Sequence, residues 1–190
     1  MRVLVTGFGP FLDVQRNPSG DVLPLLAPGV STMLLPVEYE RATRLLLERL
    51  EAEKPHAAVL LGLAEGEHVM RLETVATNRD EAAVPDNAGQ VRNGKPVVSG
   101  AVPTYRSTLP TSRLEAALGR AGFAATRSTD AGGYVCNHVY FQARHFIEGR
   151  GLGIGCGLIH VPVLDDGAGW SLERLATAVN CCVESVTTES

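Results

Sequence analysis

Three side chains that together could carry out nucleophilic catalysis occur in this sequence: the thiol of Cys136, the imidazole of His160 and the carboxylate of Glu73. Cys136 follows two glycines in AGGYVCNHVYF (131–141), where a strand pattern gives way to apolar residues at helical spacing. We expect Cys136 in the first turn of that helix, where free backbone N–H groups and the helix dipole favour the reactive thiolate. The alternative is a small buried hydrophobic residue, as most free cysteines are.

A Cys–His–Glu arrangement would divide the chemical work among its members. His160 would hold the thiolate as an ion pair, and Glu73 would fix the tautomer and orientation of the imidazole. Taken singly, His160 could equally be a satisfied core histidine, and Glu73 could be a solvated charge or an ion-pair partner. His138 lies two residues beyond Cys136, so it would face elsewhere and pack or lie at the surface. The residue types alone leave both interpretations open.

Alternating strand and helix patterns supply the framework that must position these groups. The expected strands cover 2–6, 31–37, 56–64, 69–78, 123–129 and 153–163. The expected helices cover 19–27, 38–53, 111–121, 134–148 and 172–187. This alternation predicts a three-layer αβα sandwich with a largely parallel, mixed central sheet, in a single domain over residues 1–190. Sites in such sheets gather at the carboxyl ends of strands, where we expect the three groups to meet.

One long segment interrupts the alternation. Residues 79–103 are rich in Gly, Pro, Asn and Asp, which is typical of irregular structure. An Asn-Gly pair at Asn93 and Gly94 favours a hairpin turn there. Long excursions in compact domains are usually functional, so we expect a lid or an interface.

Composition, charge and cysteine spacing argue against several classes of protein and of site. A net charge of −4 without a basic cluster argues against nucleic-acid binding, and no apolar run is long enough to cross a membrane. The N-terminus enters a strand pattern without a signal-peptide layout, so we expect a cytoplasmic protein. The four cysteines form no disulfide framework, and without a CxxC pair or an HExxH motif we expect no metal site.

The motifs around the three groups resemble the pyroglutamyl peptidase I (pyrrolidone-carboxylate peptidase) family of cysteine peptidases. The stretches concerned are VLVTGFGPF (3–11) with NPS (17–19), VPDNAG (84–89), AGGYVCNH (131–138) and GLIHVP (157–162). The resemblance implies Cys136 as nucleophile, His160 as base and acid, and Glu73 as the third member. It further implies hydrolysis of N-terminal pyroglutamyl residues from peptides through a thioacyl-enzyme, without metal or organic cofactor, by a homotetramer.

Pyroglutamate is an uncharged lactam, so an aromatic slot with a few hydrogen bonds would suit it. The resemblance implies a set of substrate-binding residues, namely Phe8, Phe11, Asn17, Tyr134, Val135 and Leu63. The two phenylalanines would flank the lactam ring, and Asn17 would support the pocket by hydrogen bonding. Alternatively, the phenylalanines are ordinary core, and Asn17 organises the turn at Asn17-Pro18.

Several positions depart from the family pattern. Leu63 replaces a usual Gln, and other common residues are replaced by Glu65, Glu67, Leu72, Thr74 and Ala83. Thr74 and Ala83 stand where the family has cations, so catalytic rate and substrate preference stay open. Two other functions therefore compete with the first: a related lactam or acyl amidase, and a catalytically silent α/β binding module.

Overall fold

A six-stranded sheet forms the middle of the protein in a computed structural model that describes residues 1–164 and 169–187. The strand order is β2-β1-β3-β10-β4-β9. The strands are β1 (Val3–Phe8), β2 (Ser31–Leu35), β3 (Ala57–Leu63), β4 (Met70–Glu73), β9 (Ala125–Ser128) and β10 (Gly155–Val161). β4 is antiparallel to β10, and the other neighbouring pairs are parallel. The sheet is therefore mixed and mostly parallel, as predicted.

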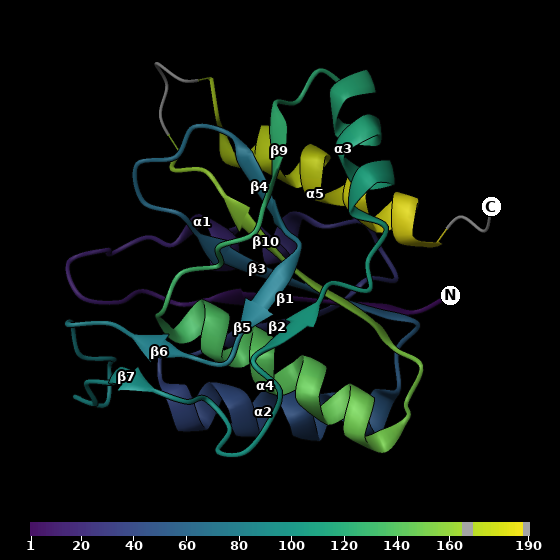
Figure 1. Ribbon diagram of the computed structural model, residues 1–190. Helices are drawn as coiled ribbons and strands as arrows, with labels where there is room; N and C mark the ends of the chain where they lie inside the picture. Colours follow the sequence, from purple (N-terminus) through teal and green to yellow (C-terminus); the bar gives the residue numbers. More distant parts are fainter. Residues whose placement is uncertain (165–168, 188–190) are drawn as a thin grey trace.

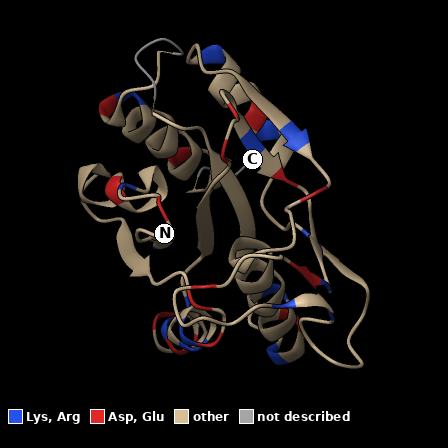
Figure 2. Ribbon diagram, turned by 90° about the vertical axis from the view of Figure 1, so that its left-hand side faces the viewer, with Lys and Arg blue, Asp and Glu red and all other residues tan. Residues whose placement is uncertain are grey.

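Helices cover both faces of this sheet (Figure 1). One face carries α2 (Tyr39–Glu53) and α4 (Val135–Arg150), and the other carries α3 (Thr111–Arg120) and α5 (Leu172–Thr187). Alternate residues of each central strand enter the two cores, so these strands are apolar throughout. The colours in Figure 2 place the charged residues on the helices and outer elements, around a sheet centre without them. The predicted three-layer αβα sandwich is confirmed.

The helix predicted over 19–27 is wrong in extent. The structure has a four-residue helix, α1 (Pro18–Asp21), followed by a 3₁₀ turn, η1 (Leu23–Leu25). Asn17 caps α1 by accepting the N–H of Ser19 at 3.1 Å. Pro24 lacks the N–H that an α-helix would need at this point, and its ring would clash with the preceding turn. The spacing of the apolar residues in 19–27 does not reveal that the helix ends after Asp21.

The strand predicted over 69–78 is two strands in two sheets. β4 ends at Glu73, and β5 (Val75–Thr77) pairs with β8 (Thr104–Arg106) in a separate small sheet. At the break, the backbone N–H and the side-chain hydroxyl of Thr74 both donate to the carbonyl of Ser128, at 2.7 Å each. The carbonyl of Thr74 accepts the N–H of Ser107, next to β8, at 2.9 Å, so the chain passes from the main sheet to the small sheet directly after Glu73.

The segment 79–103 contains a short antiparallel pair, β6 (Asp80–Glu81) and β7 (Asn93–Lys95). Asn93 and Gly94 lie within β7, so the hairpin turn predicted there is wrong. The chain turns instead at Asp86, whose carboxylate accepts the N–H groups of Ala88 and Gln90. An aspartate that binds backbone N–H groups two and four residues ahead makes a turn as well as an Asn-Gly pair does.

Candidate active site

Glu73 and His160 meet because they lie on neighbouring antiparallel strands. In the β4–β10 ladder Glu73 is opposite Leu158, and His160 is opposite Arg71. Residues two apart on a strand share a face, so Glu73 lies one diagonal step from His160. The Nδ1–H of His160 donates to Oε1 of Glu73 at 2.8 Å, and Glu73 is completely buried. Because a carboxylate only accepts, this bond places the proton on Nδ1 and leaves Nε2 for the reacting group.

Cys136 is the second residue of α4, in the first helical turn, as predicted. Its thiol lies close enough to the imidazole of His160 to raise the pKa of that ring. The two groups meet above Gly62 of β3, the residue opposite His160 on that side of the sheet. A Cβ atom at Gly62 would lie 2.8 Å from Sγ of Cys136 and 3.2 Å from Nε2 of His160. Gly62 therefore provides the space in which thiol and imidazole lie next to each other.

The route by which the chain brings Cys136 to His160 differs from the prediction. β9 runs parallel to β4 and hence opposite to β10, so Ser128 at its carboxyl end is level with Glu73 and Leu158. The three groups therefore do not come from carboxyl ends at one edge of the sheet. Residues 129–134 instead lead the chain from the end of β9 to the start of α4.

The two glycines before the nucleophile have separate structural causes. Gly132 has a φ of 76°, a conformation that favours glycine, and its N–H donates to Oδ1 of Asp130 at 2.9 Å. A Cβ atom at Gly133 would lie 2.6 Å from the carbonyl oxygen of Glu81 in β6. The N–H of Glu81 donates to the carbonyl of Gly133 at 2.8 Å. Gly132 makes the turn, and Gly133, which has no side chain, allows β6 to pack against the loop.

The electrostatics of the site favour a charged imidazole. Burial lowers the pKa of His160 and is the largest single influence on it. The hydrogen bonds to Cys136 and Glu73, together with the charges of these two groups, outweigh burial and raise the pKa to about 9. His160 is thus held as an imidazolium at neutral pH, where it can act as the partner of a thiolate and as a general acid.

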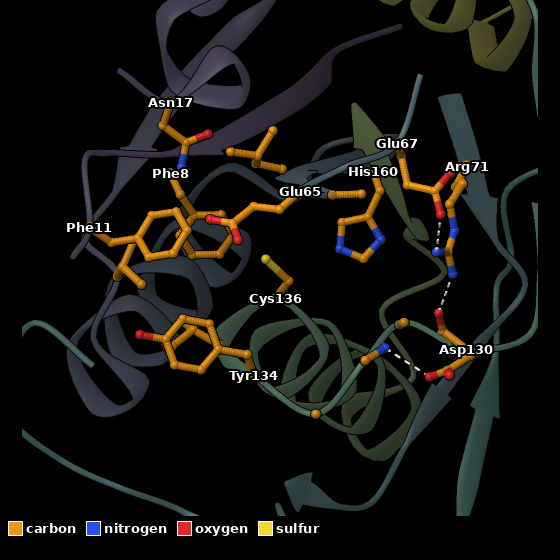
Figure 3. A pocket seen from close by; sticks show the side chains of 17 residues that line it. Phe8, Phe11, Asn17, Glu65, Glu67, Arg71, Asp130, Tyr134, Cys136 and His160 are labelled. Carbon is orange, nitrogen blue, oxygen red and sulfur yellow. Dashed lines mark hydrogen bonds and ion pairs between the residues drawn. The ribbon is translucent and has the colours of Figure 1, made fainter. Parts of the chain in front are cut away.

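A pocket of about 300 Å³ opens over Sγ of Cys136. Its lining includes Cys136, His160 and the whole predicted substrate-binding set, Phe8, Phe11, Asn17, Leu63, Tyr134 and Val135. Glu73 does not line the pocket, since it lies buried behind His160. Figure 3 shows the aromatic side chains at one end, Cys136 in the middle, and His160 with charged residues at the other end. Arg71, Glu67 and Asp130 belong to this charged part of the lining, whereas the side chain of Glu65 reaches toward the aromatic end (Figure 3).

Hydrogen bonds made by Tyr134 and Asn17 hold the residues at the aromatic end of the pocket in place. Phe11 and Tyr134 lie with ring centroids 6.1 Å apart, and the Tyr134 hydroxyl donates to the carbonyl of Pro85 at 2.8 Å. Oδ1 of Asn17 accepts from the N–H and the hydroxyl of Ser19, and Nδ2 donates to the carbonyl of Gly9 at 3.0 Å. Asn17 therefore both lines the pocket and organises the turn that precedes α1.

Residues 79–103 contribute no side chain to the lining of this pocket. The segment is fixed instead by a buried cluster in which Asp80 accepts from Nδ1 of His138 at 2.9 Å and pairs with Arg92 at 3.4 Å. His138 is 1% exposed, so the prediction that it packs away from the nucleophile is confirmed. Both the lid and the interface interpretations of 79–103 stay predictions.

Two residues that contact the catalytic groups were not singled out from the sequence. Gly62 interrupts an otherwise bulky apolar strand, which is a sign of close approach by another group. Arg71 lies two residues before Glu73 in the sequence, which does not by itself predict a contact. The structure brings one of its nitrogen atoms to within 3.3 Å of Oε1 of Glu73.

Comparison with known proteins decides the family. A family model described as pyroglutamyl peptidase matches residues 1–188. The chain belongs to the pyroglutamyl peptidase family. The pyrrolidone-carboxylate peptidase of Gloeobacter violaceus is 40% identical over 174 residues, covering 88% of this chain and 84% of that protein. The pyrrolidone-carboxylate peptidase of Pyrococcus furiosus is 36% identical over 172 residues, covering 87% and 83% of the two chains.

Solved structures agree with this assignment. Pyroglutamyl peptidase I of Bacillus amyloliquefaciens superposes with a TM-score of 0.92 at 27% identity, over 97% of this chain and 96% of that one. A mutant pyrrolidone carboxyl peptidase of Pyrococcus furiosus gives 0.90 at 32% identity, over 98% of each chain. The predicted fold and enzyme class, a cysteine peptidase of the pyroglutamyl peptidase family, are thereby confirmed. The amidase and silent-module alternatives are not favoured.

Within residues 1–164 and 169–187, no helix combines the length and the apolar character needed to cross a membrane.

Proposed function

We propose that this chain hydrolyses the bond after an N-terminal pyroglutamyl residue, with Cys136, His160 and Glu73 as its catalytic groups. The observation that carries the proposal is the continuous set of contacts from Glu73 through His160 to Cys136, at the floor of a pocket with an aromatic end. A nucleophile, a base and an orienting carboxylate in mutual contact are the parts that covalent acyl transfer needs.

In the first half-reaction, Sγ of Cys136 attacks the carbonyl carbon that joins pyroglutamate to the next residue, and a C–S bond forms. The oxyanion lies near the start of α4, where backbone N–H groups including that of Cys136 have no partner within the helix. His160 then gives the proton on Nε2 to the departing amine, and the C–N bond breaks. The products are a free amine and a thioester.

In the second half-reaction, neutral His160 takes a proton from water, which attacks the thioester carbonyl. The C–S bond breaks, pyroglutamate leaves, and the imidazolium–thiolate pair forms again. Glu73 keeps its hydrogen bond to Nδ1 throughout, so the imidazole presents the same nitrogen to each reacting group.

Substrate selection follows from the chemistry of the aromatic end. The lactam of pyroglutamate has no ammonium group, so aromatic faces and neutral hydrogen-bonding groups match it better than a carboxylate would. Phe8, Phe11 and Tyr134 supply the faces, and Val135 and Leu63 complete the apolar wall next to the thiol. Asn17 keeps this wall in position through its loop contacts.

The resemblance to the family also supports a cytoplasmic homotetramer, with residues 1–190 of each subunit forming one domain. Sedimentation equilibrium tests this assembly directly, because a monomer of this chain would have one quarter of the expected mass.

The test of the function compares a fluorogenic pyroglutamyl amide with alanyl and prolyl amides of the same fluorophore. We expect turnover of the pyroglutamyl amide alone, and its loss in Cys136→Ala with an unchanged circular dichroism spectrum. Cys181→Ala is the matched control, because this second partly exposed thiol lies on α5, outside the pocket. Normal turnover by Cys136→Ala would refute the assignment, and preference for another acyl amide would show a different amidase.

A further inference from the structure

The carboxylate of Glu73 is bound by two cationic side chains through one oxygen atom. Oε1 accepts the Nδ1–H of His160 at 2.8 Å, and it forms a salt bridge with Nε of Arg71 at 3.3 Å. The other oxygen, Oε2, is buried and has no hydrogen-bond partner among the described residues. Within residues 1–164 and 169–187, Arg71 is the one lysine or arginine that forms a salt bridge with Glu73.

The position of Arg71 follows from the strand register. Arg71 lies directly opposite His160 in the β4–β10 ladder and two residues before Glu73 on β4. All three side chains therefore project from the same face of the sheet. The side chain of Arg71 is 24% exposed, whereas that of Glu73 is completely buried. The guanidinium thus lies between the buried carboxylate and the mouth of the pocket.

The remaining nitrogen atoms of Arg71 fix the guanidinium in this place (Figure 3). NH2 donates to Oγ of Ser128 at 2.8 Å and to the carbonyl of Asp130 at 2.7 Å. NH1 donates to Oε1 of Glu67 at 3.0 Å. Asp130 also binds Gly132 in the loop before the nucleophile, so Arg71 connects Glu73 to that loop. A planar group with donors on three sides can hold such an arrangement, which a lysine ammonium cannot.

The salt bridge between Arg71 and Glu73 matters at one step of the catalytic cycle. When His160 passes its proton to the leaving amine, the imidazole becomes neutral, and Glu73 would be left as a buried carboxylate without a cation. An uncompensated buried charge is strongly unfavourable, but arginine keeps its charge at every pH of interest. Arg71 can therefore keep Oε1 aimed at Nδ1 during the step in which the charge of His160 disappears.

We propose that Arg71 is a positioning residue for the reaction, acting on His160 through Oε1 of Glu73. The proposal rests on the function given above, since it assigns Arg71 a role only if Glu73 and His160 are catalytic. The alternatives are that Arg71 binds substrate directly, as a pocket-lining residue, or that it serves the stability of β4 and β9 alone.

A double-mutant cycle with Arg71→Met and Glu73→Gln separates these cases. In the wild-type background, Arg71→Met should lower kcat about 10- to 100-fold with KM for the pyroglutamyl amide within about twofold. In the Glu73→Gln background, the same change should alter kcat by less than about threefold, because the carboxylate on which Arg71 acts is absent. Arg71→Lys keeps the charge without the planar group and should recover only part of kcat.

Arg127→Met is the matched control, because Arg127 lies on the adjacent strand β9 and pairs with Glu115 at 2.9 Å, outside the pocket. It should keep kcat and KM. An equal loss of kcat in both Glu73 backgrounds, or a raised KM at constant kcat, would overturn the proposal. If Arg71→Met does not fold, the same cycle with Arg71→Lys decides. Failure of the function itself would appear separately, as normal turnover by Cys136→Ala.

Discussion

The space above Gly62 gives the most direct test of the geometry of the active site. In Gly62→Ala, the added Cβ would lie 2.8 Å from Sγ of Cys136 and 3.0 Å from Cδ2 of His160. Ordinary van der Waals contacts begin at 3.4 Å. The thiol must therefore withdraw by about 0.6 Å, the difference between 3.4 and 2.8 Å, or the imidazole must tilt away. Either movement separates the two groups that have to exchange a proton.

The expected loss follows from the size of that movement. A displacement of about 1 Å of a reacting group costs roughly 100-fold in rate, so a shift of this size should lower kcat/KM by about 10- to 100-fold. Gly62 lies in β3 with a backbone conformation that alanine adopts readily, because its φ is not positive. The fold should therefore survive, and the loss should appear in kcat more than in KM.

Two assays measure this effect independently. Steady-state hydrolysis of a fluorogenic pyroglutamyl amide gives kcat and KM, and the rate of iodoacetamide alkylation reports the reactivity of Cys136 without any substrate. Both rates should fall in Gly62→Ala. Gly149→Ala is the control, because Gly149 lies on α4 with no atom within 4 Å of an added Cβ. That variant should keep both rates and gain about 0.5–1 kcal/mol of stability.

The result that would refute this reasoning is simple to recognise. If Gly62→Ala keeps kcat/KM and the alkylation rate within about threefold of wild type, thiol and imidazole do not meet in the space that the glycine leaves. Loss of the folded state, seen by circular dichroism, would show that the strand rather than the catalytic pair needs the glycine.

Two further predictions concern stability. Because the folded-state pKa of His160 is raised from 6.5 to about 9, its contribution is complete below pH 6.5 and is lost as pH rises to 9. Urea unfolding should show a loss of up to about 3 kcal/mol over that window, and a pH-independent difference from His160→Gln would contradict it. Asp80→Ala removes the buried partner of His138, so it should cost about 3–5 kcal/mol in urea unfolding while kcat at low temperature stays normal. A cost below about 1 kcal/mol would show that the cluster does not hold residues 79–103.

The sequence predicted those features that local spacing encodes. The apolar runs of β3 and β10, the helical stripe of α4 and the position of Cys136 in its first turn all follow from short patterns, and the structure has them. The catalytic residues were found because a thiol, an imidazole and a carboxylate are chemically distinctive. The resemblance to a family then supplied the pocket residues, all of which lie around one cavity.

The features that the sequence did not predict depend on pairing between distant segments. The strand pattern continues through Thr74, and only the folded chain shows that the Thr74 carbonyl turns away from the main sheet to accept the N–H of Ser107. β4 runs antiparallel to β10, and this pairing determines which residue of β4 lies opposite His160. No local sequence pattern encodes that register. For the same reason, the contact of Arg71 with Glu73 and the space above Gly62 emerged only from the folded chain.

The loop that carries the nucleophile is anchored at both of its glycines, by Asp130 at Gly132 and by the backbone of β6 at Gly133. A loop held in this way has little freedom to rearrange, so the reactive sulfur is pre-organised before any peptide arrives. Such an enzyme does not need to use binding free energy to close a loop over its substrate. Discrimination between peptides then falls to the fixed shape of the cavity, and association should proceed in one kinetic phase without a slow isomerisation.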